Sequence, residues 1–259
     1  MQINELIKSN IELSEVVDKS IGLVSESLSK TKFKKTSRAL LSYIPKSGYI
    51  HNSILNCCAT NGGYATGILF RSLIEHTFRH LYIYTRALRE DSDEVGVEYY
   101  GKLKGSEDLE SFTKINNYTK VVHPNQSSWN TKGDYNKDIM EIGKKFGISN
   151  IFFYLIENSK TDEYLIDEGM KDYLLSRLKQ YTGLSSYIHG GPYAEMCYEE
   201  LMKDSEKMNG HLEGVAMESS KLYKSMIEST YFFASLFDDQ ITSHYESIHG
   251  LGAQRLSKC

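Results

Sequence analysis

Residues 62–90 constrain the fold more than any other stretch, because their pattern is that of one long helix. Apolar side chains fill much of its circumference, and they are Ile68, Leu69, Leu73, Ile74, Phe78, Leu81 and Tyr82. A helix that is apolar around most of its surface is usually buried in the middle of a domain. We therefore expect the rest of the chain to pack around residues 62–90.

Charged and titratable side chains interrupt this apolar surface at helical spacing. Arg71, Glu75 and Arg79 are four residues apart, so their side chains share one face. His76 and His80 are also four apart, on a neighbouring face about 100° round the helix. Because charges inside a buried helix cost free energy unless they are paired, the three charged residues either pair with one another or project into a cavity.

The rest of the chain repeats the helical pattern. Only three prolines interrupt the 259 residues, which permits long helices, and alternating strand patterns are absent. We predict an all-α fold, a single multi-helix bundle of roughly seven to nine helices. Helices are expected at residues 3–29, 37–41, 49–60, 62–90, 98–122 (one or two helices), 134–147, 151–156, 167–189, 193–209 and 211–246.

Several boundaries between these helices carry their own signals. Residues 45–48 and 190–192 combine proline with glycine and are predicted to end helices. Ser106 is a candidate N-cap for a helix with Leu109, Phe112 and Ile115 directed inward. Residues 123–130 are the longest loop-like stretch, and the tail from residue 247 to residue 259 is expected to be loosely held.

The charge balance argues against a protein that binds nucleic acid over its whole surface. The formal net charge is −4, which gives no overall electrostatic attraction to a polyanion. Lys30, Lys32, Lys34 and Lys35 form a local basic cluster that can contact phosphate. A solvated turn between two helices is the favoured interpretation of this cluster.

The cysteines and the N-terminus indicate the compartment. Cys57, Cys58, Cys197 and Cys259 lack the spacing of a zinc site and are expected to be free thiols in a reducing environment. The N-terminus has no signal-peptide pattern, and no run of about 18 apolar residues predicts a membrane span. We expect a cytoplasmic protein without a membrane partner.

His76 and His80 share a face and can form half of a metal site. A zinc-protease helix needs glutamate directly after its first histidine, and Thr77 stands there. No further close pair of histidines or carboxylates completes a metal shell, so neither a metal nor another cofactor is predicted. Serine or cysteine nucleophile signatures and phosphate-binding glycine loops are absent too.

Arg71, His76 and His189 remain as candidate catalytic residues. An arginine and a histidine at one site can cleave RNA without a metal. The histidine moves the proton of the ribose 2′-hydroxyl, and the arginine stabilises charge on the phosphate. The polar residues around them are the candidate binding residues, namely Glu75, Arg79, His80, Tyr187 and Ser185.

Two motifs carry a family resemblance. The stretch Phe70-Arg71-Ser72-Leu73-Ile74-Glu75, followed later by Tyr-x-x-Leu-Ser-x-Tyr-x-His-Gly from Tyr181 to Gly190, resembles a family of bacterial all-helical proteins of unknown function. That family is similar to the HEPN superfamily of helical ribonucleases, toxins and phage-defence components. The superfamily motif is an arginine, four to six residues and a histidine, which Arg71 and His76 match. The resemblance covers two short stretches of the chain.

The resemblance implies a helical, metal-independent ribonuclease or toxin-type effector in bacterial antiviral defence or stress response, with RNA as its partner. HEPN proteins commonly dimerise, and their motifs meet across the interface. An ideal helix separates Arg71 from His76 by about 140°. Both can therefore reach one phosphate only on an irregular helix or at a site shared between two chains.

Two alternatives stay open beside the ribonuclease. Arg71, Glu75 and His189 can form a buried hydrogen-bonded cluster that only ties two helices together. The protein can then be a non-catalytic interaction or regulatory protein that binds a partner protein. In either case we expect a homodimer, through the apolar face of the separable helix 3–29 or of the helix 211–246. The first of these faces contains Ile3, Ile7, Ile11, Val17, Ile21, Val24 and Leu28.

Overall fold

The computed structural model describes residues 3–124, 134–158 and 170–256, and within these ranges every regular element is a helix. In chain order they are α1 (Ile3–Ser29), α2 (Lys34–Ala59), α3 (Gly63–Glu90), α4 (Glu94–Val97), the π-helix η1 (Glu98–Leu103), α5 (Lys104–Val122), α6 (Asp134–Lys145), α7 (Ile148–Asn158), α8 (Met170–His189), α9 (Pro192–Met202), α10 (Ser205–Ser235) and α11 (Asp239–Leu256). The predicted all-α fold is confirmed. None of the described helices is both long and apolar enough to cross a membrane.

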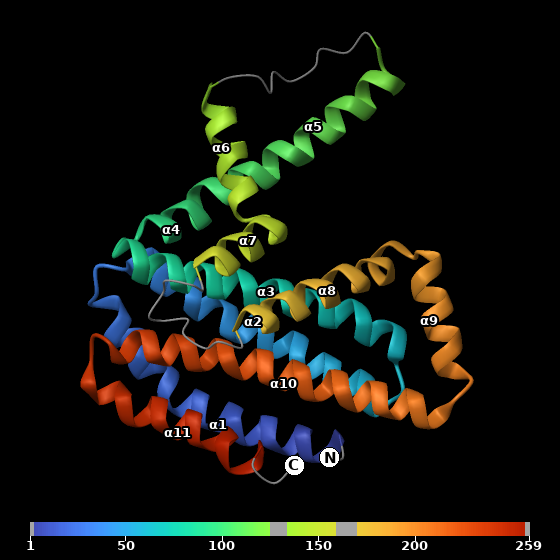
Figure 1. The fold of residues 1–259 in the computed structure, drawn as a ribbon. Coiled ribbons are helices and arrows are strands. Elements are labelled where there is room, and N and C mark those ends of the chain that lie inside the picture. The colour runs from blue at the N-terminus through green and yellow to red at the C-terminus, as the bar shows by residue number, and fades with distance from the viewer. Residues whose placement is uncertain (1–2, 125–133, 159–169, 257–259) are drawn as a thin grey trace.

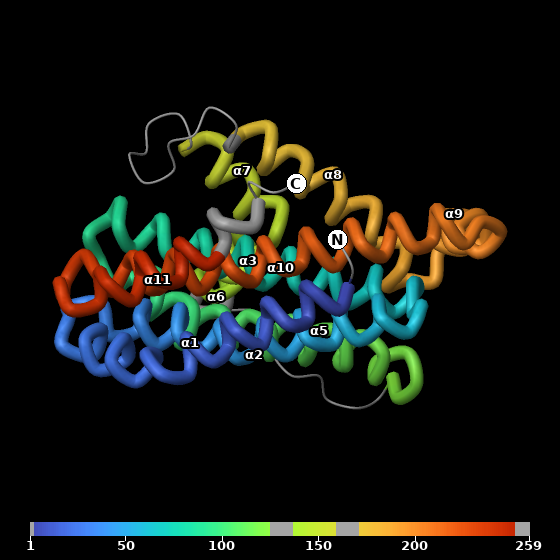
Figure 2. Tube along the Cα trace, turned by 90° about the horizontal axis from the view of Figure 1, so that it is seen from below, coloured from blue at the N-terminus to red at the C-terminus, as the bar shows by residue number. Residues whose placement is uncertain are grey.

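Two long helices, α3 and α10, form the centre of the bundle (Figure 1). α10 packs against α1, α2, α3 and α11, and α3 also packs against α7 and α8. Figure 2 shows α2 and α8 on opposite sides of this centre. α5 and α6 project away from the body, joined to it through α4, η1 and α7. The buried apolar side chains of the body form one continuous cluster.

Polar pairs fix the position of α10 within this apolar core. Each pair joins α10 to a different helix, and they are Ser20 Oγ with Tyr231 Oη at 2.8 Å, His51 Nδ1 with Ser219 Oγ at 3.0 Å, and His80 Nε2 with Thr230 Oγ1 at 2.9 Å. Buried polar groups are stable when they are hydrogen-bonded, and each bond is made at one position along the helices. The pairs therefore set the register of α1, α2 and α3 against α10.

An ion pair attaches the projecting helices to the body. The guanidinium of Arg86 on α3 pairs with Glu98 of η1 and with Glu90, and Lys145 of α6 also reaches Glu98 at 3.1 Å. Burial is the largest single effect on the pKa of the Glu98 carboxyl and raises it, but the hydrogen bonds and charges of Arg86 and Lys145 together outweigh burial, so the pKa is lowered. Removing one partner would leave a buried charge uncompensated, so the network holds the base of α5 and α6 in place.

The expected helices 37–41 and 49–60 are in fact one continuous helix, α2. The predicted stop at residues 45–48 was wrong because the exposed Pro45 ring stands on the solvent side, where a helix tolerates a lost hydrogen bond best. Gly48 serves packing instead. A Cβ at this position would lie 2.7 Å from the hydroxyl oxygen of Tyr223, so only glycine lets α2 and α10 approach this closely.

The last two expected helices are divided differently in the structure. Residues 193–209 do not form one helix, because Asp204 caps α10 by accepting hydrogen bonds from the backbone N–H groups of Glu206 and Lys207. Residues 211–246 are likewise divided, by a turn between α10 and α11. The segment expected to be a loose tail continues α11 to Leu256, with Ile248 fully buried.

Two further expectations concern which side chains of α1 and α5 are buried. α1 has the expected bounds, yet Ile11 is exposed, since the buried stripe follows Leu6, Leu13, Val17, Val24 and Leu28. Ser106 lies inside α5 and does not cap it, and Phe112 and Ile115 are exposed because α5 stands off the body.

The boundaries of the remaining helices agree well with expectation. Residues 62–90 form α3, and the apolar run 151–156 is helical within α7. The predicted stop at residues 190–192 is present, with Gly190 at φ 60°. Most of the predicted loop 123–130, and residues 167–169 of the expected helix 167–189, lie outside the described residues.

Candidate functional site

A row of three charged side chains runs along α3 at the edge where α8 crosses it. Glu75 lies in the middle and pairs with Arg79, whose Nη2 is 2.9 Å from Oε1, and with Arg71, whose Nη1 is 3.7 Å from Oε2. All three side chains are only partly exposed, between 16% and 25%. Of the two alternatives, pairing with one another or projecting into a cavity, the structure shows the first, in a position that still reaches solvent.

Tyr181 of α8 completes this cluster from the opposite helix. Arg71 Nη2 donates to the Tyr181 hydroxyl at 2.7 Å, and that hydroxyl donates to Glu75 Oε2 at 3.4 Å. The Arg71 guanidinium also lies 4.2 Å from the centre of the Tyr181 ring. Burial and the Glu75 carboxylate raise the pKa of Tyr181, so its hydroxyl keeps its proton. We call Arg71, Glu75, Arg79 and Tyr181 the charged cluster.

The charged cluster has donors left over. The Nε atoms of Arg71 and Arg79 are buried and have no hydrogen-bond partner among the described residues. Buried N–H groups in folded proteins are nearly always paired. Guanidinium groups in general match the geometry of phosphate and carboxylate oxygens.

His76 lies on the other side of α3, toward α2. Its Nδ1 is 3.4 Å from Ser47 Oγ, and its ring meets the Tyr43 ring edge-on at 5.6 Å. Burial, and then the positive charge of Arg79, lower the pKa of His76 below its ordinary value, while Glu75 opposes this effect. The imidazole is therefore neutral at neutral pH and able to accept a proton.

Arg79, not Arg71, is the arginine whose charge acts on His76. α3 is a regular helix over this stretch, so Arg71 turns toward α8 while His76 turns toward α2. Arg71 and His76, whose spacing suggested the family resemblance, thus lie on different sides of α3 within one chain. Arg79 follows His76 by three residues, a spacing that places neighbours on a helix surface.

The remaining candidates are placed as follows. His80 is buried, and burial lowers its pKa to about 3, so it belongs to the core and not to the charged cluster. Tyr187 is buried against the Tyr64 ring, and its backbone oxygen accepts a hydrogen bond from the Tyr64 hydroxyl. Ser185 is half-buried. His189 is exposed at the last residue of α8, roughly 12 Å along that helix from Tyr181.

Sequence reasoning did not single out Tyr181 as a site residue, although it opens the second of the two motifs. The signal was present in that motif, whose first residue is a tyrosine on the same expected helix as His189. The partnership of Tyr181 with Arg71 depends on how α8 crosses α3, which one sequence does not reveal. The motif residue that meets Arg71 is therefore Tyr181, and not the histidine at the other end of α8.

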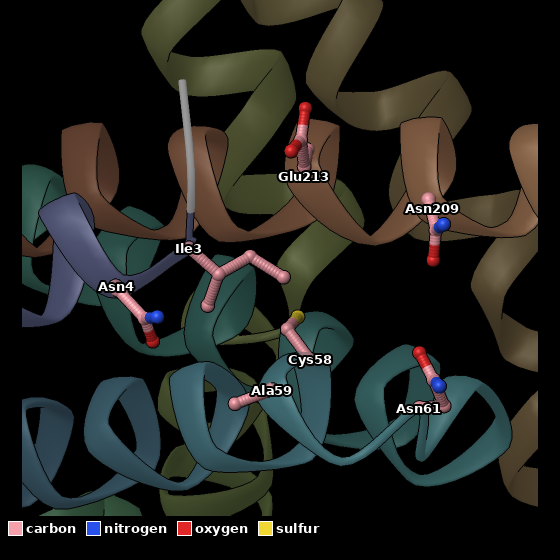
Figure 3. A pocket seen from close by; sticks show the side chains of 7 residues that line it. All are labelled: Ile3, Asn4, Cys58, Ala59, Asn61, Asn209 and Glu213. Carbon is pink, nitrogen blue, oxygen red and sulfur yellow. The ribbon is translucent and has the colours of Figure 1, made fainter.

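A separate pocket of 340 Å³ lies where the start of α1 meets the end of α2 and the first turns of α10 (Figure 3). Its lining residues are Ile3, Asn4, Cys58, Ala59, Asn61, Asn209 and Glu213. Figure 3 shows the amides of Asn61 and Asn209 pointing toward each other. Burial raises the pKa of the Cys58 thiol to about 11, so it is not a thiolate nucleophile. None of the candidate residues from the sequence lines this pocket.

Among the described residues no group of three or more histidines, cysteines and carboxylates is arranged to hold a metal ion. Comparison with known proteins adds no further constraint, since no family model, no curated protein and no solved structure matches the chain.

Proposed function

We propose that this protein is a HEPN-like, metal-independent ribonuclease, acting in bacterial defence or stress response. The observation that carries the proposal is a neutral, partly buried histidine beside an arginine, His76 with Arg79, next to buried guanidinium donors that have no partner in the described part of the chain. A neutral imidazole is the form that a general base requires. The family resemblance supplies RNA as the substrate.

In this mechanism His76 takes the proton from a ribose 2′-hydroxyl, and the 2′-oxygen attacks the adjacent phosphorus. The 5′-oxygen leaves and receives the proton back from the imidazolium. Arg79 stabilises the negative charge that develops on the phosphoryl oxygens. Arg71 lies further along the helix, held by Tyr181 and Glu75, where it can hold a neighbouring phosphate.

The proposal includes a homodimer, because HEPN motifs commonly meet across an interface. The apolar faces of α1 and α10 are used inside the chain, so neither offers the spare surface that the sequence indicated. Exposed apolar side chains lie instead on α5, where Ile115, Tyr118 and Val122 are each more than half exposed. In such a dimer the exposed His189 can contribute to the partner's site.

Cleavage of a labelled single-stranded RNA in excess EDTA tests the proposal. We expect cleavage by the wild type, and a loss of at least about 100-fold in His76→Asn and in Arg79→Gln, since each removes a group that acts on the reacting atoms. Both side chains are partly exposed, so the melting temperatures should stay within a few degrees. Arg89→Gln, at an exposed arginine on the last turn of the same helix, is the matched control and should cleave normally.

Two results would contradict the ribonuclease. One is a wild type that cleaves no RNA, and the other is cleavage that survives in both His76→Asn and Arg79→Gln. Complete inhibition by EDTA would reject the metal-independent mechanism.

The second candidate is a non-catalytic interaction protein, and a specific observation favours it. Ile115, Tyr118, Val121 and Val122 on the projecting helix α5 are 59%, 74%, 80% and 67% exposed, and apolar side chains gathered on one exposed surface are typical of sites that bind other proteins. The charged cluster would then only join α3 to α8. Inactivity of the wild type toward RNA, together with loss of a stable complex or dimer in Tyr118→Ser, would favour this candidate.

A further inference from the structure

α2 is unusual in its charge. Over 26 residues it carries four basic side chains and neither aspartate nor glutamate, in a chain whose net charge is −4. The basic residues are Lys34, Lys35, Arg38 and Lys46, and all four are exposed. On an ideal helix they fall within about 120° of the circumference. The solvent face of α2 is therefore a basic stripe, and we call it the basic face.

Several lysines elsewhere in the chain are paired with a carboxylate one helical turn away. Ion pairs at this spacing join Lys30 to Glu26, Lys114 to Glu110, Lys207 to Asp204, Lys221 to Glu218 and Lys224 to Glu228. Within the described residues, no ion pair is made by any of the four side chains of the basic face. Their positive charge is thus available to an external anion.

The acidic residues nearest to the start of α2 are occupied in other ways. Asp93 accepts hydrogen bonds from the backbone N–H groups of Lys35 and Thr36, which caps α2. The negative charge of Asp93 offsets part of the positive potential at the first turn of α2. Lys46 lies roughly 16 Å further along the helix axis than Lys35, beyond this influence.

Aromatic side chains are interleaved with these charges. The Arg38 guanidinium lies 5.0 Å from the centre of the Tyr100 ring of η1. Tyr49, one turn beyond Lys46 on the same face, is 77% exposed. Aromatic rings beside basic groups are the arrangement that proteins use to bind single-stranded nucleic acids, because rings stack on bases while basic groups hold phosphates.

The basic face leads directly to the candidate catalytic histidine. Lys46 lies close enough for its charge to contribute to the lowered pKa of His76, and its ammonium lies 6.0 Å from the centre of the Tyr43 ring, on which His76 packs. A strand held along α2 would therefore arrive at His76 and Arg79. Stacked nucleotides advance about 3.4 Å each, so roughly five span the distance from Lys35 to Lys46.

We propose that the basic face of α2 is a docking surface for single-stranded RNA, with Lys35, Arg38 and Lys46 on phosphates and Tyr49 stacked on a base. The choice of RNA over other polyanions rests on the proposed function. The charge, exposure and position of the surface do not depend on it.

The test is the affinity for a labelled single-stranded RNA in a His76→Asn background, which removes the proposed base while leaving α2 intact. In the variant that combines Lys34→Gln, Lys35→Gln, Arg38→Gln and Lys46→Gln we expect at least tenfold weaker binding. The slope of log affinity against log salt should also decrease in magnitude by about 2, since the three proposed phosphate contacts are lost and each contributes roughly 0.7. Tyr49→Ala should weaken binding without changing that slope.

The matched control removes four exposed lysines from other helices, through Lys8→Gln, Lys19→Gln, Lys120→Gln and Lys144→Gln. It lowers the net charge by the same amount and should bind RNA within about twofold of its parent. Equal weakening in the control and the α2 variant would overturn the proposal, because only net charge would matter. Unchanged binding in the α2 variant would overturn it too, and so would binding of the α2 face to anionic vesicles or an acidic peptide in preference to RNA.

This experiment separates the docking surface from the ribonuclease. Loss of RNA binding in the α2 variant, together with an inactive wild type, supports the surface and rejects the enzyme. Cleavage by the wild type, together with normal RNA binding by the α2 variant, supports the enzyme and rejects the docking surface.

Discussion

The polar groups on the two sides of α3 are satisfied in opposite ways. On the side that faces α10, His80 is 1% exposed, and its Nε2 donates to Thr230 Oγ1, whose own proton goes to the Met226 carbonyl. On the side between α2 and α8, Glu75 binds two arginines and Tyr181, yet the Nε donors of both arginines have no partner among the described residues. The inner groups are neutral and complete, whereas the outer groups are charged and retain binding capacity.

This difference suggests a division of roles along one helix. Neutral, fully paired groups inside a core fix the packing, and the protein loses stability when such groups become charged or are removed. Charged, partly exposed groups contribute little to stability, but they can bind a ligand of opposite charge. Stability should therefore depend on the inner pairs, and anion binding on the charged cluster.

Lowering the pH should have the largest effect on stability, and it should act through His51 and His80, which are buried against α10. Burial lowers the pKa of His51 to about 4 and that of His80 to about 3, from an ordinary value of 6.5. Below pH 6.5 the unfolded chain binds protons that the folded chain does not, so stability falls as the pH falls. By pH 5 each histidine should lower the free energy of unfolding by about 2 kcal/mol. This pH still lies above the range in which ordinary carboxyl groups titrate.

Denaturant unfolding between pH 7.5 and pH 5 measures this loss. His80→Gln removes one of these two buried histidines and should flatten the curve by up to about half, because burial also lowers the pKa of His76 and His211, which contribute to the slope. A free energy of unfolding that stays constant over this range would show that the inner histidines are not held neutral by burial.

The second effect compares two histidines one turn apart on the same helix. His80→Ala leaves a cavity in the core and should cost about 3 kcal/mol. His76→Ala removes a partly exposed ring with one long hydrogen bond and should cost about 1 kcal/mol or less. Denaturant unfolding of both variants at pH 7.5 provides the measurement. Equal losses would mean that His76 belongs to the core, which would weaken its assignment as a general base.

Much of the fold could be predicted from the sequence, because local patterns determine it. The bounds of α1 and α3 follow from helical periodicity, and the end of α8 follows from glycines before proline. The errors arose where tertiary contacts decide. Pro45 is tolerated inside α2 because it faces solvent, and Gly48 marks a close contact with Tyr223 instead of a stop.

The site was predicted less completely, for the same physical reason. Periodicity placed Arg71, Glu75 and Arg79 on one face, and in the structure they pair with one another, one of the two alternatives that the sequence left open. Periodicity cannot show which helix lies opposite each face, so the partnerships of Tyr181 with Arg71 and of Thr230 with His80 could not be predicted. These contacts join residues 110 and 150 positions apart in the chain.

The smallest effect on stability should come with the clearest effect on binding, in Glu75→Gln. The glutamine keeps the shape of the side chain but removes the charge that neutralises Arg71 and Arg79. Partly exposed ion pairs contribute about 1 kcal/mol or less, so the melting temperature should fall by only a few degrees. Affinity for single-stranded RNA should rise severalfold, because the arginines no longer share their charge with a carboxylate.

Glu228→Gln is the matched control for this change. Glu228 on α10 also pairs with two basic side chains, Lys224 and His249, and is 25% exposed against 24% for Glu75. The control should lose a similar amount of stability and bind RNA as the wild type does. If Glu75→Gln instead loses several kcal/mol and its RNA affinity does not change, the charged cluster is a structural joint between α3 and α8, and the division of roles along α3 is wrong.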